Sequence, residues 1–195
     1  MPEIENRRSI RKFDGREVPN DLLEQIVMAG QLAPSAKNRQ PWKLIVTSGN
    51  AKREALSAMK RGLECEKREP FLPESAANLA DAEHTLTVTE RAPAVIFVVN
   101  TLGAELTRPL TVDERVFEIC NAQSIGAAMQ NMSLTAVELG LGSLWICNTF
   151  FAQRELNEWL NTDGELFAAL AVGYPAETPP PRTRKPAYET AEWRK

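Results

Sequence analysis

The feature that most constrains the fold is a short run of apolar residues, AVIFVVN, at residues 94–100. The run is apolar up to its last residue, and Pro93 marks its entry. A strand without alternation of polar and apolar residues buries both of its faces. The rest of the chain must therefore cover two sides of a β-sheet.

The surrounding sequence predicts helices and further strands. Helices are expected at residues 21–32, 50–61, 113–139 and 153–160, with one more after Pro73, and strands at 42–48, 143–147 and 166–173. Asp21 and Glu24 have the spacing of a capping box, and Gly62 and Gly140 are expected to follow the ends of helices. Neither a repeat nor a linker interrupts this order, so residues 1–195 are predicted to form one domain.

Charge and apolar content argue against several classes of protein. The formal net charge is −3, which does not favour a nucleic-acid partner. No apolar run approaches the roughly 20 residues that span a bilayer, so no membrane partner is expected. The N-terminus lacks the apolar segment of a secretory signal, and we expect a cytoplasmic protein.

The cysteines and the single histidine give no metal site. Cys65, Cys120 and Cys147 contain no C-x-x-C pair, which fits a reducing compartment and neither a disulfide scaffold nor a cysteine-ligated metal. His84 cannot form a histidine metal cluster by itself. A solvated histidine is the simpler interpretation, and a catalytic triad built on His84 stays formally open.

The C-terminal segment is rich in proline. Five of the 13 prolines lie at residues 175–186 and predict an extended arm that is not helical. Tyr174, Tyr188 and Trp193 are expected to anchor this arm along a surface, and a structureless tail is the alternative.

Two basic clusters lie near opposite ends of the chain. Residues 7–12, RRSIRK, combine four cations with a hydroxyl and suit a phosphate. Arg182 and Arg184 are two residues apart on an extended segment, so both can bind one anion. Solvated basic surface is the alternative for both clusters.

A third polar segment, LAPSAKNRQPW, spans residues 32–42. Its prolines bracket hydroxyl and amide groups, which can donate and accept along the edge of a heterocycle such as a flavin. A simple polar turn is the alternative. Because the sequence has neither a G-x-G-x-x-G nor a P-loop motif, arginines would have to hold a nucleotide-like cofactor.

Together these segments resemble the nitroreductase family of FMN-dependent oxidoreductases. The resemblance rests on RRSIRKF at 7–13, APSAKNRQPW at 33–42, QNMSLTAVELGLGS at 130–143 and the G-Y-P-x-E…R-x-R-K-P pattern at 173–186. It implies an α+β nitroreductase-like fold, with a central mixed sheet flanked by helices and an extended C-terminal arm exchanged in a homodimer. Two FMN cofactors would then lie at the subunit interface.

The resemblance also implies which residues bind the cofactor. The phosphate and ribityl chain would be held by Arg7, Arg8, Ser9, Arg182 and Arg184. Arg11 would face the N1–C2=O side of the ring, and the other subunit would supply Pro34, Ser35, Ala36 and Asn38. The backbone of Trp145, Ile146, Cys147 and Asn148 would lie near flavin N5.

The implied activity is hydride transfer from NAD(P)H through flavin N5 to an electron-poor acceptor, such as a nitroaromatic or a quinone, by ping-pong exchange. No side chain is expected to act as a nucleophile or general base. Many family members place Glu and Gly where this chain has Cys147 and Asn148, so the pocket wall differs. Dehalogenation, enone reduction, an oxidase reaction or flavin binding without turnover are the alternatives.

Overall fold

The centre of the protein is an antiparallel sheet in the order β1-β2-β4-β3, in a computed structural model that describes residues 2–71 and 74–194. The strands are β1 (Trp42–Ser48), β2 (Ala94–Asn100), β3 (Gly142–Ile146) and β4 (Glu165–Gly173). Every predicted strand is confirmed to within one residue. All three ladders between these strands are antiparallel. Among the described residues, the parallel pairing expected of a mixed sheet is limited to one bridge, between Ser9 and Ser143.

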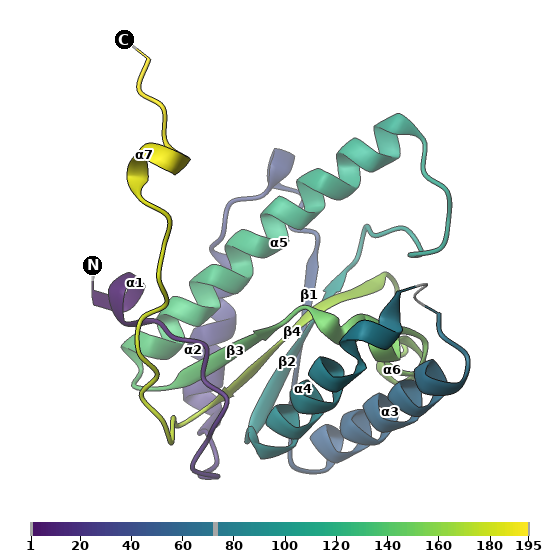
Figure 1. Cartoon of the computed structure of the whole chain (residues 1–195), viewed down its shortest axis with the longest axis horizontal. Coiled ribbons are helices and arrows are strands. Elements are labelled where there is room, and N and C mark those ends of the chain that lie inside the picture. The colour runs from purple at the N-terminus through teal and green to yellow at the C-terminus, as the bar shows by residue number, and fades with distance from the viewer. Residues whose placement is uncertain (1, 72–73, 195) are drawn as a thin grey trace.

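Helices cover both faces of this sheet (Figure 1), which confirms an α+β fold. One face is covered by α2 (Asn20–Gln31) and α5 (Val112–Glu138), and the other by α3 (Gly49–Arg68), α4 (Leu79–Arg91) and α6 (Gln153–Leu160). The short helical segments are α1 (Pro2–Asn6), η1 (Ala36–Asn38), η2 (Ser75–Asn78), η3 (Asn148–Ala152) and α7 (Ala187–Thr190). Among the described residues, no helix is both long and apolar enough to cross a membrane.

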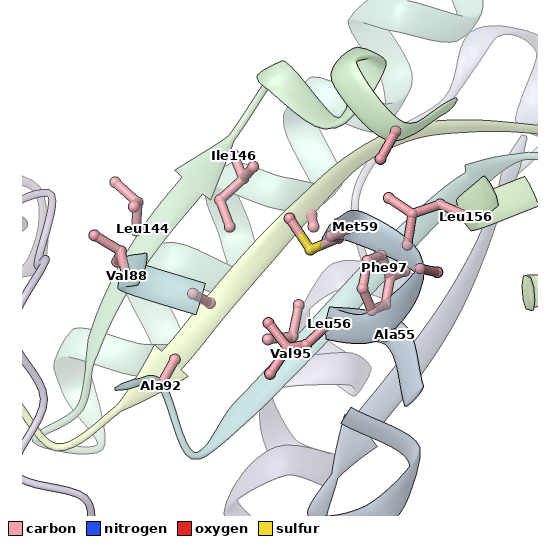
Figure 2. Close-up of a cluster of buried hydrophobic side chains, with 14 of the residues drawn as sticks. Ala55, Leu56, Met59, Val88, Ala92, Val95, Phe97, Leu144, Ile146 and Leu156 are labelled. Carbon is pink, nitrogen blue, oxygen red and sulfur yellow. The ribbon is translucent and has the colours of Figure 1, made fainter. Parts of the chain in front are cut away.

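Strand β2 is buried on both faces, as its uninterrupted apolar run predicts. Successive side chains of a strand point to opposite faces. Val95 and Phe97 accordingly join the core cluster with α3, α4 and α6, while Ile96 and Val98 join the cluster with α2 and α5. Figure 2 shows the first cluster, with labelled side chains of the three helices together with those of β2 and β3.

Helix α3 does not end at Gly62, so the sequence-based prediction of its end is wrong. The helix continues to Arg68, and Gly62 is buried within it. A Cβ added at Gly62 would lie 2.4 Å from the Cβ of Ala152 in η3. This glycine therefore allows two backbones to approach closely and does not stop the helix.

The predicted capping box at Asp21 and Glu24 is also wrong, because Pro19 precedes α2 and no side chain caps this helix. A capping box forms instead at the start of α5. There Glu114 N donates to Thr111 Oγ1 at 3.3 Å, and Thr111 N donates to Glu114 Oε2 at 2.8 Å. The predicted end of α5 is confirmed by Gly140, which follows the helix with φ +73°.

The arm is extended over residues 175–186, as predicted, but Ala187–Thr190 form one helical turn. Tyr174 packs against the core cluster of α2 and α5, and the guanidinium of Arg16 lies 4.0 Å from its ring centroid. Tyr188 and Trp193 are 81% and 87% exposed. The prediction that these two side chains anchor the arm on its own chain is therefore wrong. After its first residues the arm runs away from the rest of the chain (Figure 1).

Candidate functional site

The N-terminal basic cluster is held against strand β3. Ser9 forms a parallel bridge with Ser143, and Ile10 N donates to the carbonyl oxygen of Ser143 at 2.9 Å. Ile10 is buried and fits closely over Gly142, where an added Cβ would lie 2.6 Å from Ile10 Cγ1. The segment thus extends the edge of the sheet and fixes Arg8, Ser9 and Arg11 along it.

The same N-terminal segment pairs with the first residues of the C-terminal arm. Ala176 N donates to Lys12 O at 2.8 Å, and Asp14 N donates to Tyr174 O at 3.1 Å. An antiparallel bridge joins Phe13 to Pro175 between these bonds. Two segments that lie near opposite ends of the sequence therefore form one short ribbon.

The cations of this ribbon donate mainly to neutral groups. Arg8 Nη1 donates to the carbonyl oxygens of Glu5 and Arg7 at 2.6 and 2.9 Å, and Arg11 Nη1 donates to that of Ser9 at 3.2 Å. Arg7, Arg8, Ser9 and Arg11 are half-buried. Among residues 2–71 and 74–194, no carboxylate forms an ion pair with Arg11, so its charge can act on a ligand.

Arg182 and Arg184 follow the ribbon along the arm, and both are exposed. Arg184 Nη1 donates to the carbonyl oxygens of Arg182 and Thr183 at 3.4 and 3.1 Å. The structure therefore joins the root of the arm to the N-terminal cluster. Between described residues, no hydrogen bond or ion pair joins Arg182 or Arg184 to residues 7–12.

The loop at residues 32–42 is anchored on α5. Ala36 N donates to Ser124 Oγ at 3.2 Å, and Gln40 N donates to Ser35 Oγ at 3.0 Å. The amide of Gln40 also donates to Asn38 Oδ1 at 3.2 Å. Pro34 and Asn38 are exposed, and Lys37, Asn38 and Gln40 have positive φ. No hydrogen bond between described residues joins this loop to residues 7–12 of the same chain.

The end of β3 presents the four predicted residues in different environments. Ile146 is buried in the core cluster of α3, α4 and α6, and half-buried Trp145 packs on the α2 and α5 side. Asn148 Nδ2 donates to Thr85 Oγ1 of α4 at 3.0 Å, which fixes the turn after the strand. Cys147 is exposed, yet partial burial of its thiol raises the pKa of that thiol above its ordinary value.

A cavity of about 710 Å³ lies elsewhere, between the end of α3, helix α6 and residues 105–107. Its walls include Glu66, Phe71, Leu106 and Phe150. None of the predicted cofactor-binding residues lines it. Among the described residues, no group of three or more His, Cys, Asp or Glu side chains is placed to hold a metal ion.

Three residues that support the candidate site were not predicted from the sequence. Ser124 and Thr85 hold the loop at 32–42 and the end of β3, and Glu177 accepts backbone hydrogen bonds from Arg11 and Lys12. Glu177 belongs to the G-Y-P-x-E pattern, which is the one signal that could have drawn attention to it. Ser124 and Thr85 lie in helices, and nothing in their local sequence marks them.

The fold and the placement of these segments can be compared with known proteins. The sequence model of the Nitroreductase family matches residues 4–174. The chain belongs to the nitroreductase family. This membership confirms the resemblance found in the sequence and supports an oxidoreductase.

Relatives of similar length share about a quarter of the sequence. YfhC of Bacillus subtilis (strain 168), provisionally named an NAD(P)H nitroreductase, is 28% identical over 186 residues, which cover 94% of this chain and 88% of YfhC. A protein named NADH dehydrogenase from Thermus thermophilus is 27% identical over 201 residues, which cover 96% of this chain and 92% of that protein.

Solved structures share the fold. The FMN- and NADPH-dependent nitroreductase NfnB from Sphigopyxis sp. strain HMH has a TM-score of 0.78 at 21% identity and covers 99% of this chain and 97% of its own. The FMN-dependent nitroreductase NfnB of Mycobacterium smegmatis, solved with NADPH, has a TM-score of 0.75 at 19% identity and covers 100% of this chain and 97% of its own. These likenesses confirm a nitroreductase-like fold.

Proposed function

We propose that this chain binds FMN and passes hydride from NAD(P)H to an electron-poor acceptor, such as a nitroaromatic or a quinone, by ping-pong exchange. The observation that carries the proposal is the docking of residues 9–14 between β3 and the root of the arm. This docking presents several cations along one edge of the sheet. Family membership and the FMN-dependent structural neighbours support the same assignment.

The donor set fits the phosphorylated end of FMN. Guanidinium groups bind phosphate oxygens through two parallel hydrogen bonds, and a serine hydroxyl adds a further donor. Arg7, Arg8 and Ser9 would supply these groups from the sheet edge, and Arg182 and Arg184 from the arm. Within the part of the chain that the structure describes, Arg184 donates only to neutral carbonyls of its own segment, so it can turn toward an anion without breaking an ion pair there.

At the other end of the cofactor, bound FMN would supply hydride transfer at N5. Arg11 would place its positive charge beside N1–C2=O and favour the electron-rich reduced state. The backbone at Trp145, Ile146, Cys147 and Asn148 would lie beside N5, held in place by the bond from Asn148 to Thr85. Partial burial raises the pKa of the Cys147 thiol and so favours its neutral form, whereas the Glu that the resemblance places here in many family members would carry a carboxylate.

The proposal includes a homodimer, because Pro34, Ser35, Ala36 and Asn38 would reach the flavin from the other subunit. Large apolar side chains support a second copy, since they are exposed at the start of α5 and the end of α2, where a monomer would leave them in water. They are Val112 at 80%, Val116 at 51%, Ile119 at 52%, Met28 at 61% and Leu32 at 82% exposure. In Figure 1 the first half of α5 projects beyond the sheet.

The visible spectrum of the freshly purified protein tests this function. We expect a yellow protein that releases FMN, identified by mass, and that sediments as a dimer. Anaerobic mixing with NADH or NADPH should bleach the flavin, and added acceptor should restore its colour. A colourless protein that takes up no FMN would overturn the proposal, and a flavoprotein that neither nucleotide bleaches would indicate flavin binding without turnover.

A further inference from the structure

Glu177, at the root of the arm, binds the backbone of the N-terminal segment through its side chain. Its Oε1 atom accepts hydrogen bonds from Arg11 N at 2.5 Å and from Lys12 N at 3.1 Å. The glutamate and Arg11 are 166 positions apart in sequence. Both Glu177 and Arg11 are half-buried, so the bond between them is partly shielded from water, whereas the bond to Lys12 is exposed.

The two bonds extend the ribbon between the chain ends. Ala176 N donates to Lys12 O as in an ordinary strand pair, and the next residue along the arm then supplies a side-chain carboxylate. A carboxylate accepts two neighbouring N–H groups more strongly than a neutral carbonyl does. Glu177 therefore restrains the backbone on both sides of the Arg11 carbonyl.

This restraint bears on the guanidinium that would face the flavin. Arg11 has a long side chain, and its position depends on where its backbone is held. The guanidinium donates to the carbonyl oxygen of Ser9, which β3 fixes from the other side. Strand β3 and Glu177 thus hold Arg11 from two directions.

We propose that Glu177 is a positioning residue for Arg11. By holding the backbone of Arg11, Glu177 fixes where the guanidinium lies and thereby helps to set the reduction potential of the bound flavin. The inference rests on the proposed function, because it requires FMN next to Arg11. Glu177 does not touch the reacting atoms. Its effect on the flavin is indirect and passes through the backbone of Arg11, so it does not depend on a direct interaction of the Glu177 carboxylate with the ring.

A double-mutant cycle tests this coupling. Arg11→Ala and Glu177→Ala should each lower the midpoint potential of bound FMN. Glu177→Ala should also raise the Kd for FMN about tenfold, because without these two hydrogen bonds the backbone of Arg11 is no longer held beside the cofactor. In the double variant the potential should be no lower than in Arg11→Ala alone. A general loosening of the arm would weaken FMN binding but would leave the potential of the bound flavin at the wild-type value.

Two further variants separate length and charge. Glu177→Gln keeps an acceptor oxygen at the same reach, so its FMN affinity should stay within about threefold of wild type. Glu177→Asp keeps the charge but is one methylene shorter, so it should behave like Glu177→Ala. Glu24→Ala removes an exposed carboxylate from α2 and serves as the control for a change in net charge.

The outcomes distinguish this inference from the function on which it depends. A wild-type protein that binds no FMN, or an Arg11→Ala variant with an unchanged potential, overturns the role of Arg11 and with it the role of Glu177. If Arg11→Ala lowers the potential and Glu177→Ala does not, only the positioning role fails. Additive shifts in the double variant would also refute it. If Glu177→Ala does not fold, Glu177→Asp and Glu177→Gln give the same comparison.

Discussion

The hydroxyl of Ser124 on α5 joins the central helix to the backbone of Ala36. Ser124 Oγ accepts from Ala36 N at 3.2 Å and donates to the carbonyl oxygen of Cys120 at 2.7 Å. Ser124 is 5% exposed, so water cannot readily replace its hydroxyl as the acceptor for Ala36 N. One small side chain thus fixes the loop that would reach the flavin of the other subunit.

Ser124→Ala should destabilise the protein by about 1–3 kcal/mol, because the N–H of Ala36 loses its acceptor in a partly buried position. Urea denaturation measures the loss, and FMN titration should show weaker binding. Ser133→Ala is the matched control, since Ser133 is also buried on α5 and its hydroxyl donates to the carbonyl of Met129 but accepts from no described residue. Equal losses in the two variants would contradict a role for the bond to Ala36.

Gly62→Ala should destabilise the protein by about 1–3 kcal/mol, although alanine favours helices, because the new Cβ would lie 2.4 Å from that of Ala152. Thermal unfolding measures the change. Gly126→Ala in α5 is the comparison, since the nearest atom to its added Cβ, in Trp145, is 3.9 Å away. That variant should be neutral or more stable by about 0.5–1 kcal/mol. A stabilised Gly62→Ala would show that η3 can move aside.

Arg11→Ala should lower the midpoint potential of bound FMN by about 30–60 mV, which corresponds to about 1.5–3 kcal/mol for a two-electron couple. The lost guanidinium no longer favours the reduced flavin. Arg11→Lys keeps a charge and should lose less. Arg61→Ala, on the exposed side of α3, controls for net charge. Spectroscopic titration against reference dyes gives the potentials, and identical values for wild type and Arg11→Ala would remove the assigned role.

The capping box of α5 should make stability depend on acid pH. Hydrogen bonds from Thr111 N, from Arg108 and from the Thr111 hydroxyl lower the pKa of Glu114 from 4.5 to about 2. The lowered pKa means that this stabilisation is present above pH 4.5 and is lost as the pH falls toward 2. Glu114→Gln should therefore have a lower Tm than wild type at pH 7, and the difference should shrink on acidification. Asp113→Asn, its exposed neighbour, is the control. A constant difference across this range would argue against the ionised cap.

The sequence alone determined most of the secondary structure and the family. Strand β2 could be predicted because its apolar run is a local pattern that both layers of helices must cover. The end of α5 at Gly140 could be predicted for the same reason. The residue after a helix often has a positive φ, and glycine adopts this conformation most easily. The motifs at residues 7–13 and 33–42 identified the family for the same reason, because each is contiguous.

The tertiary structure alone decided which distant groups meet. Gly62 looked like a helix stop, and only the approach of η3 shows why the helix passes through it. The pairs Glu177 with Arg11 and Ser124 with Ala36 are separated by 166 and 88 positions. Periodicity and propensity report on neighbours within a few turns or strand residues, whereas these bonds depend on how the sheet and its connections bring remote backbone groups within 3.5 Å of an acceptor.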